Sequence, residues 1–182
     1  MKPEEIELLI AQVKKGIQPA ITLLYEQQKS YWFRICLRYA KNRDEAQDVF
    51  QDGVAKIFEK IDTFNAKKGS FNAWSNKVLV HEVLRTLKKN QWQNSFSSVE
   101  GYEQEAYNQD QAIERISAKE LTEVIQALPL GYRVVFNMYE IEGYSHKEIA
   151  EELNISTGTS KSQLSRAKKV LQNEIVKLFE IK

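Results

Sequence analysis

The side chains best suited to binding chemistry lie along residues 161–171, near the C-terminal end of the sequence. They combine cations, hydroxyls and an amide, and none is acidic: Lys161, Ser162, Gln163, Ser165, Arg166, Lys168 and Lys169. Such groups can donate to base edges in the major groove of DNA and can neutralise phosphates. Leu164, Ala167 and Leu171 recur between them at helical spacing, which predicts a helix with one apolar and one polar side.

A second helix is predicted immediately before this one. Ser145 followed by Glu148 has the pattern of a capping box, and Ile149 and Leu153 then recur at helical spacing. The residues between the two helices have turn chemistry: Asn154, Ser156, Thr157 and Gly158. Together these features predict a helix-turn-helix, whose second helix enters the groove. The alternative is a helical hairpin whose polar side is only solvated.

The bulk composition limits where such a surface can lie. The 182 residues include 26 Lys+Arg and 25 Asp+Glu, a net charge of +1, so any basic surface must be local. No apolar run approaches the roughly 18 residues of a membrane helix, and the acidic N-terminal segment does not resemble a signal peptide. We therefore expect a cytoplasmic protein without membrane insertion. Cys36 falls on the apolar side of a predicted helix, where we expect a buried thiol.

No pattern in the sequence predicts an enzyme. It contains no nucleophile elbow and no glycine-rich phosphate loop. His81 and His146 are too few and too scattered to suggest a metal site. We expect no catalytic residues, no metal, no cofactor and no small-molecule substrate.

Amphipathic helices are predicted throughout the first 90 residues. Their apolar positions span residues 6–13, 19–40, 46–61 and 71–87, with Pro19 opening the second helix and Asp44 capping the third. Asp48, Gln51 and Asp52 form a polar patch on the third helix, which is either an ordinary solvated side or a surface for a partner.

Lysines and aromatic residues meet where the fourth helix begins. A loop with Lys67 and Lys68 precedes Phe71, Trp74 and Lys77. Rings beside cations suit single-stranded nucleic acid, because bases stack on the rings while phosphates meet the lysines. Composition alone favours the other interpretation, in which the rings fill the core and the lysines are solvated.

A polar segment separates these helices from those near the C-terminus. Residues 91–110 are rich in Gln, Asn, Ser and acids and have no apolar period, which predicts a linker. One helix is then expected over residues 113–128, and another from Pro129 to Gly143 with Val134, Met138 and Tyr139 facing inward. Because nothing alternates with period two, no sheet is predicted.

Three segments, in this order, resemble the bacterial sigma factors of RNA polymerase, specifically the small extracytoplasmic-function (ECF) group. DEAQDVFQDGVAKIFEKIDTF is similar to the helix that docks on the polymerase clamp, and KKGSFNAWSNKVLVHEVLRTLKK to the segment that opens and reads the minus-ten element. LPLGYRVVFNMYEIEGYSHKEIAEELNISTGTSKSQLSRAKKVL is similar to the domain-four signature. The resemblance implies an all-α fold: a region 2-like domain (1–90), a flexible linker (91–111) and a region 4-like helix-turn-helix domain (112–182).

The resemblance also implies roles for individual residues. The residues implied to bind core polymerase are Asp48, Gln51, Asp52 and Phe58. Those implied to bind the minus-ten element are Lys67, Lys68, Ser70, Phe71, Trp74 and Lys77. Those implied to bind the minus-thirty-five element are Lys161, Ser162, Gln163, Ser165, Arg166 and Lys168. The implied partners are core RNA polymerase, promoter DNA and an anti-sigma protein.

The sequence departs from the family's pattern at a few positions. Gln163 stands where Arg is usual, His81 where Asn is common, and Arg85 where Asp is common. These differences affect the exact promoter sequence and leave the general role intact. Two other functions fit the residues less completely: a stand-alone helix-turn-helix regulator, and a helical adaptor that binds proteins and not DNA.

Overall fold

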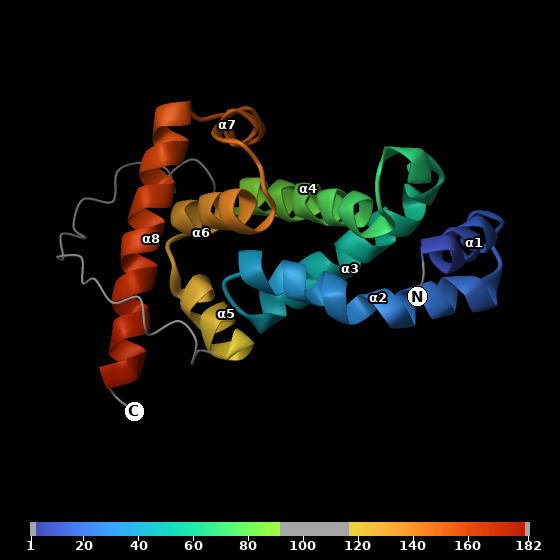
Figure 1. Ribbon diagram of the computed structural model, residues 1–182, viewed down its shortest axis with the longest axis horizontal. Coiled ribbons are helices and arrows are strands. Elements are labelled where there is room, and N and C mark those ends of the chain that lie inside the picture. Colours follow the sequence, from blue (N-terminus) through green and yellow to red (C-terminus); the bar gives the residue numbers. More distant parts are fainter. Residues whose placement is uncertain (1–2, 92–116, 181–182) are drawn as a thin grey trace. The chain divides into compact units, whose positions relative to one another are not determined.

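The structure is a computed structural model that describes residues 3–91 and 117–180 (Figure 1). Every regular element in these ranges is helical, which confirms the predicted all-α fold class. The chain divides into two compact units, Met1–Asn90 and Gln91–Lys182. Of the predicted linker, only Gln91 is described, as the last residue of a helix. The remainder of that segment lies outside the described residues, as do Ile113 and Ile116 of the helix predicted after it.

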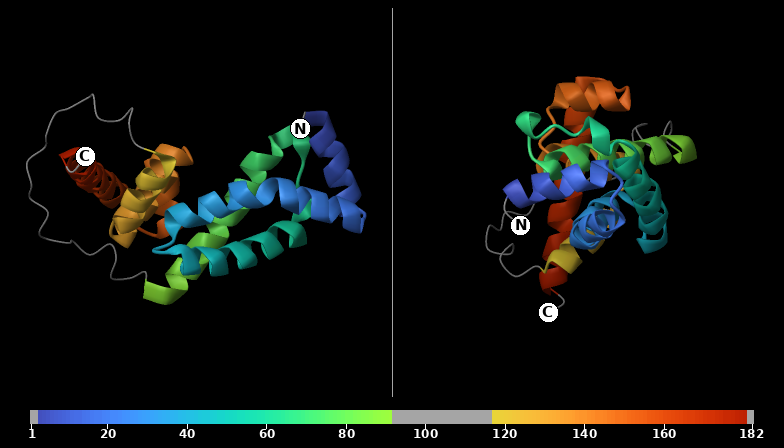
Figure 2. Two further views of the ribbon diagram at one scale, coloured as in Figure 1. Left: turned by 90° about the horizontal axis from the view of Figure 1, so that it is seen from below. Right: turned by 90° about the vertical axis from the view of Figure 1, so that its right-hand side faces the viewer.

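The first unit is built from long helices and two short 3₁₀ turns. Its elements are α1 (Pro3–Lys14), α2 (Gln18–Tyr39), α3 (Arg43–Glu59), η1 (Ile61–Thr63), η2 (Ala66–Lys68) and α4 (Phe71–Gln91). Gly16, at φ +72°, ends the turn after α1, and Pro19 lies in the first turn of α2 as predicted. Helix α3 runs alongside α2 (Figure 2).

The cap of α3 differs from the prediction. Asn42, and not Asp44, is the N-cap: its side-chain oxygen accepts a hydrogen bond from the Glu45 amide at 2.8 Å. Asp44 lies inside the first turn, where its charge complements the helix dipole. Asn42 and Asp44 are both of capping type and lie two positions apart, and the helix uses the earlier one as its N-cap.

The core of the first unit is aromatic and aliphatic. Trp32 and Ile35 of α2 are fully buried, as is Ile57 of α3. Gly53 allows α3 to approach α4, because a Cβ at this position would lie 2.5 Å from Leu79 Cδ2. Cys36 is fully buried, as predicted, and desolvation raises the pKa of its thiol to about 12.

The second unit consists of short helices packed against one side of a long C-terminal helix. Its elements are α5 (Ala118–Ala127), α6 (Leu130–Phe136), the π-helical turn η5 (Asn137–Ile141), α7 (His146–Leu153) and α8 (Thr157–Glu180). Ala167 and Leu171 of α8 pack against Ile125, Leu128 and Tyr132. This contact leaves the opposite side of α8 exposed to solvent.

The π-helical turn changes which residues face inward. The sequence predicts one regular helix from Pro129 to Gly143 with Tyr139 buried, but Tyr139 is 37% exposed, so that prediction is wrong. A π turn takes one more residue than an α turn, which rotates the following side chains around the axis. Met138, immediately before Tyr139, remains fully buried. Within the described ranges, no helix combines the length and the apolar character that a membrane span requires.

Candidate nucleic-acid interface

The helix-turn-helix of the second unit is formed by α7 and α8. Ser145 and Glu148 make the predicted capping box, with the Glu148 amide donating to Ser145 Oγ at 3.2 Å and the Ser145 amide donating to the Glu148 carboxylate at 2.8 Å. Asn154 ends α7 in the left-handed conformation, φ 55°. Thr157 and Gly158, which the sequence assigned to the turn, already belong to α8, because Ser156 Oγ accepts from the Thr159 amide at 2.9 Å.

The exposed side of α8 carries most of the predicted DNA-reading residues. The structure leaves these side chains in solvent: Lys161, Ser162, Ser165, Arg166, Lys168 and Lys169. Gln163 is the exception, since only 3% of it is exposed and its position on the polar side is therefore a wrong prediction. Gln163 lies next to Leu164, at the edge of the apolar side of α8. Packing of that apolar side against the rest of the unit therefore also buries the Gln163 side chain.

A junction of three elements, which the sequence did not predict, supports the start of α8. The Tyr139 and His146 rings stack with centroids 4.3 Å apart and planes at 22°. His146 Nδ1 lies 2.9 Å from the hydroxyl of the buried Ser160. Desolvation lowers the pKa of His146, and the nearby Lys161 ammonium lowers it further. The junction therefore favours a neutral imidazole between η5, α7 and α8.

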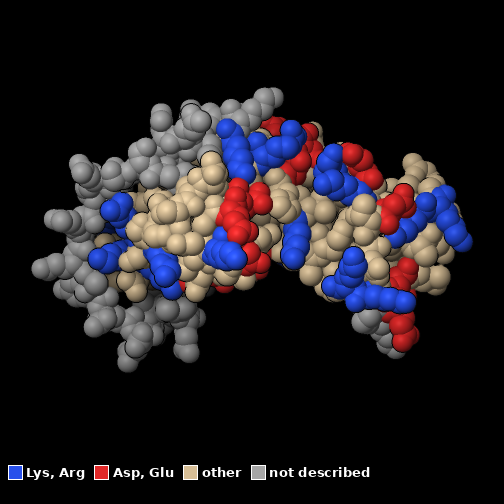
Figure 3. Space-filling model, turned by 90° about the horizontal axis from the view of Figure 1, so that it is seen from above, with Lys and Arg blue, Asp and Glu red and all other residues tan. Residues whose placement is uncertain are grey.

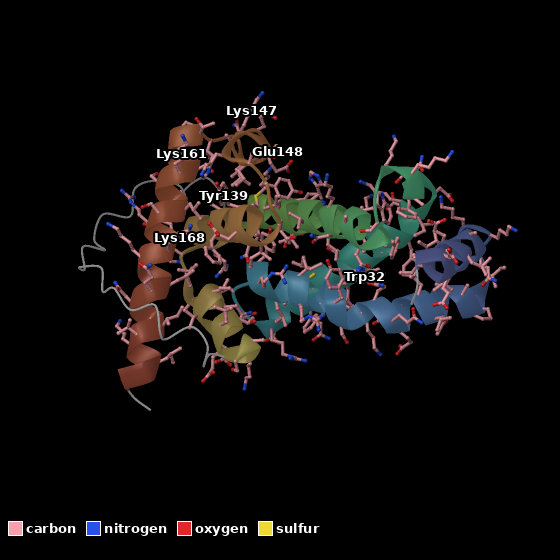
Figure 4. All side chains as sticks on the ribbon, in the orientation of Figure 1. Trp32, Tyr139, Lys147, Glu148, Lys161 and Lys168 are labelled. Atoms are coloured by element: carbon pink, nitrogen blue, oxygen red, sulfur yellow. The ribbon has the colours of Figure 1, made fainter. Side chains whose placement is uncertain are left out.

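One predicted DNA contact already has a partner within the unit. Lys168 Nζ lies 2.8 Å from a carboxylate oxygen of Glu140 in η5. In Figure 4 Lys168 lies midway along α8, and Lys161 lies nearer its N-terminal end. Periodicity could not predict this pair, because it depends on how the π turn packs against α8.

Lys147 is a further cation on this motif, at a position that residue spacing alone does not distinguish. It is exposed in the first turn of α7, and its side chain extends outward in Figure 4. A cation in a first turn opposes the helix dipole, so this position does not benefit helix stability. The exposure of Lys147 leaves its ammonium accessible from the first helix of the helix-turn-helix.

The first unit carries a pocket of about 210 Å³ where α4 begins. It is lined by Thr63, Asn65, Lys68, Gly69, Ser70, Ala73, Trp74 and Lys77. Trp74 is half-buried and presents part of its indole to the pocket, while Lys67 and Lys77 are exposed. The predicted minus-ten residues Lys68, Ser70, Trp74 and Lys77 are thus brought together.

Phe71 is not part of this surface. Only 2% of it is exposed, so its ring lies in the core of the unit, as the alternative interpretation expects for this residue. Its ring stacks on Trp74 at 5.6 Å between centroids and meets the edge of Phe64 at 5.4 Å. Phe71 therefore supports the indole from behind.

The polar patch of α3 is exposed as predicted, with Asp48, Gln51 and Asp52 all in solvent. Phe58 is half-buried and meets Trp32 edge-on, at 6.2 Å and 85°. The hydrogen bond to Glu82, and then the charge of that carboxylate, raise the pKa of the Arg85 guanidinium, and the nearby Asp52 raises it further. The patch is therefore acidic with a neighbouring cation on α4.

No group of three or more His, Cys, Asp and Glu side chains in the described parts of the chain lies together as metal ligands would. Viewed as in Figure 3, Lys and Arg are interspersed with Asp and Glu. The acid-free side of α8 over residues 161–169 is therefore a local feature of the surface.

An all-helical protein with a helix-turn-helix in one unit and an aromatic, lysine-rimmed pocket in the other belongs to the class of DNA-binding proteins. The family model for sigma-70 region 2 matches residues 24–93, and the one for sigma-70 region 4 matches residues 118–171. Together they match more than half of the chain.

Curated relatives match along almost the entire chain. The ECF RNA polymerase sigma-E factor of Escherichia coli (strain K12) is 26% identical, covering 95% of both chains. The ECF RNA polymerase sigma factor SigW of Bacillus subtilis (strain 168) is 27% identical, covering 93% of this chain and 96% of SigW. The protein belongs to the sigma-70 family of RNA polymerase sigma factors, in the ECF group.

A solved structure supports the fold. The sigma factor RpoE from Bartonella quintana, in complex with the anti-sigma factor NepR, is 22% identical with a TM-score of 0.52. The match covers 86% of this chain and 96% of that one.

Proposed function

We infer that this chain is a transcription initiation factor that binds core RNA polymerase and directs it to promoters by reading the minus-ten and minus-thirty-five elements. The observation that carries this conclusion is the occurrence of sigma regions 2 and 4 in one chain, each on its own helical unit. Near-neutral net charge fits a subunit that depends on a larger assembly for most of its DNA affinity.

In the second unit, α8 is the helix that reads the minus-thirty-five element. The residues proposed to contact DNA are Lys161, Ser162, Ser165, Arg166 and Lys168. Arg166 and the serines would donate to base edges, while the lysines would meet phosphates. Lys147 adds a phosphate contact from α7, since the first helix of this motif crosses the DNA backbone. The Lys168–Glu140 pair would open when Lys168 meets a phosphate.

In the first unit, the pocket beside Trp74 takes an unstacked base of the minus-ten element. The indole would stack on the base, and Lys67, Lys68 and Lys77 would neutralise adjacent phosphates, with Ser70 at the rim. Stacking contributes roughly 1–3 kcal/mol per base, comparable with the few kcal/mol that unstacking costs. Promoter melting is then driven by binding, and this chain itself makes and breaks no covalent bond.

The acidic patch of α3 is the surface proposed for core polymerase. Asp48, Gln51 and Asp52 would meet the polymerase directly, with the exposed part of Phe58 at the edge. By its place in the ECF group, we also expect an anti-sigma protein as a second partner.

Run-off transcription with core polymerase tests this function. Adding the full chain should produce specific transcripts, and Trp74→Ala should abolish promoter opening while leaving polymerase binding near normal. A stand-alone regulator would give no polymerase-dependent initiation on any promoter. An adaptor would keep all of its activity with Arg166→Ala and Lys161→Ala.

A further inference from the structure

The loop that precedes α4 lies between two hollows in the first unit. One is the Trp74 pocket described above. The other, of about 400 Å³, lies on the α1 side and is lined by Glu7, Ile10, Ala11, Lys14, Asp62, Thr63, Phe64, Asn65 and Ala66. Thr63 and Asn65 line both hollows, so this segment of the loop is a wall between them. Its position therefore helps to define the shape of the Trp74 pocket.

Lys14, in the last turn of α1, holds this wall from the α1 side. Its ammonium donates hydrogen bonds to the backbone carbonyls of Asp62, at 3.2 Å, and of Phe64, at 2.9 Å. Local bonds fold the rest of the loop: the Lys68 amide donates to the Asn65 carbonyl at 2.9 Å, and the Gly69 amide donates to the Ala66 carbonyl at 3.4 Å. Lys14 thus supplies the bonds that tie the loop to a different helix.

Phe64 connects the Lys14 contact to the pocket itself. The carbonyl of Phe64 accepts from Lys14, and its buried ring contacts Trp74 at 5.7 Å and Phe71 at 5.4 Å between centroids. Displacing the Phe64 backbone would therefore also displace the ring that supports the Trp74 indole. The loop wall and the aromatic wall of the pocket depend on the same residue.

We propose that Lys14 is a positioning residue for minus-ten recognition, which fixes the loop 62–65 and thereby the shape of the base pocket. This rests on the proposed function of that pocket. Lys14 itself touches no DNA in this proposal; its effect passes through the carbonyls of Asp62 and Phe64. Preorganising the pocket favours the base that fits it over bases that do not, so Lys14 contributes to specificity as well as to opening.

The test compares Lys14→Met with Lys14→Arg and Lys15→Met in the full-length chain. Met keeps most of the apolar stem and removes the donors, Arg restores donors, and the adjacent exposed Lys15 is the matched control. Holoenzyme opening is followed by permanganate reactivity on a cognate minus-ten element and on one with a substituted base. Amide hydrogen exchange of Lys68 and Gly69 is measured on the free protein.

For Lys14→Met we expect faster exchange at both amides and about three- to tenfold less opening of the cognate promoter. The opening ratio between cognate and substituted elements should also fall, while binding of core polymerase stays unchanged. Lys14→Arg should recover most of the opening and the ratio, and Lys15→Met should match the unsubstituted chain. Unchanged exchange, an unchanged ratio, or an equal loss with Lys15→Met would each overturn the proposal.

Trp74→Ala in the same assay separates this inference from the proposed function. If Trp74→Ala fails to open the promoter while Lys14→Met opens it normally, the pocket binds the base and Lys14 does not position it. If Trp74→Ala opens the promoter normally, the pocket is not the base site, and the role of Lys14 in recognition is overturned with it.

Discussion

Arg166 and Lys147 present cations from the two helices of the helix-turn-helix, and we expect them to act on DNA differently. Arg166→Ala should weaken binding to promoters with an intact minus-thirty-five element by about 1–3 kcal/mol, and have little effect where that element is already substituted. Lys147→Ala should weaken binding to promoters with the intact and with the substituted element by the same factor. It should also lower the slope of log affinity against log salt concentration by about one, because one phosphate contact is lost. Holoenzyme binding to promoter duplexes over a salt series measures both effects.

The exposed Lys119 on α5 provides the control for this pair. Lys119→Ala should leave affinity and salt slope unchanged. A loss for Arg166→Ala that is equal on intact and substituted elements would assign Arg166 to phosphates and not to bases.

A substitution at Gln163 tests whether this side chain stays in the protein interior or contacts a base pair. Only 3% of the residue is exposed, and its buried Oε1 accepts no hydrogen bond within the described residues. Gln163→Met keeps the size and removes the polar atoms, so the free energy of unfolding should stay the same or rise by up to about 1 kcal/mol. Minus-thirty-five preference, measured by selection from randomised duplexes, should not change. A changed preference at one base pair would mean that the side chain leaves the interior to meet DNA.

Asp52 tests the polymerase surface on α3. Asp52→Arg reverses an exposed charge beside Arg85, and we expect at least about a tenfold loss of affinity for core polymerase. Titration of labelled chain with core polymerase measures this loss. Glu4→Arg, an exposed charge reversal on α1 of the same unit, should have little effect. Equal affinities for both variants would remove Asp52 from the interface.

At the scale of elements, the junction between η5, α7 and α8 makes stability depend on pH. The pKa of His146 is lowered in the folded chain, so the unfolded chain binds the proton more tightly. The contribution of His146 is therefore complete above the ordinary histidine pKa of about 6.5, and is lost as pH falls below it towards the lowered pKa. Chemical denaturation at several pH values should show the second unit losing stability over this window.

His146→Phe isolates this effect, because phenylalanine keeps a ring against Tyr139 but has no titrating nitrogen. The variant should lose less stability than the original chain on acidification over the same window. His81→Phe, on the exposed side of α4, controls for histidine in the other unit. Identical pH dependence in the His146 variant would contradict the assignment.

Elements whose signals are local in the sequence were predictable. The capping box of Ser145 and Glu148 and the apolar side of α8 depend on residues a few positions apart, and both form as predicted. Tyr139 was placed wrongly because the π turn shifts the register of a helix that has a regular apolar period.

Burial at helix edges was not predictable in the same way. Phe71 and Gln163 were assigned to surfaces, yet the structure buries both. Residue type and spacing indicate the direction in which a side chain points from its own helix. How many positions on that helix become buried depends on the neighbouring element that packs against it. The Lys14 contacts with the loop and the Lys168–Glu140 pair depend on such tertiary packing as well.

At the scale of the whole molecule, the charge of the chain predicts that it does not bind promoter DNA well by itself. A net charge of +1 and interspersed acids limit how many phosphates the chain can neutralise (Figure 3). Because counterion release scales with neutralised phosphates, the free chain should bind duplex weakly. With core polymerase bound, both units contribute at once, and their effects multiply.

Fluorescence anisotropy with one labelled promoter duplex tests this directly, at fixed salt, for the chain alone and for the reconstituted holoenzyme. We expect the holoenzyme to bind at least about a hundredfold more tightly, consistent with the gain of linked sites. Scrambling the minus-thirty-five element should weaken the holoenzyme and change little for the chain alone, whose weak binding is largely nonspecific. Tight, sequence-dependent binding by the chain alone would instead match a stand-alone regulator, because such a protein must recognise its site without polymerase.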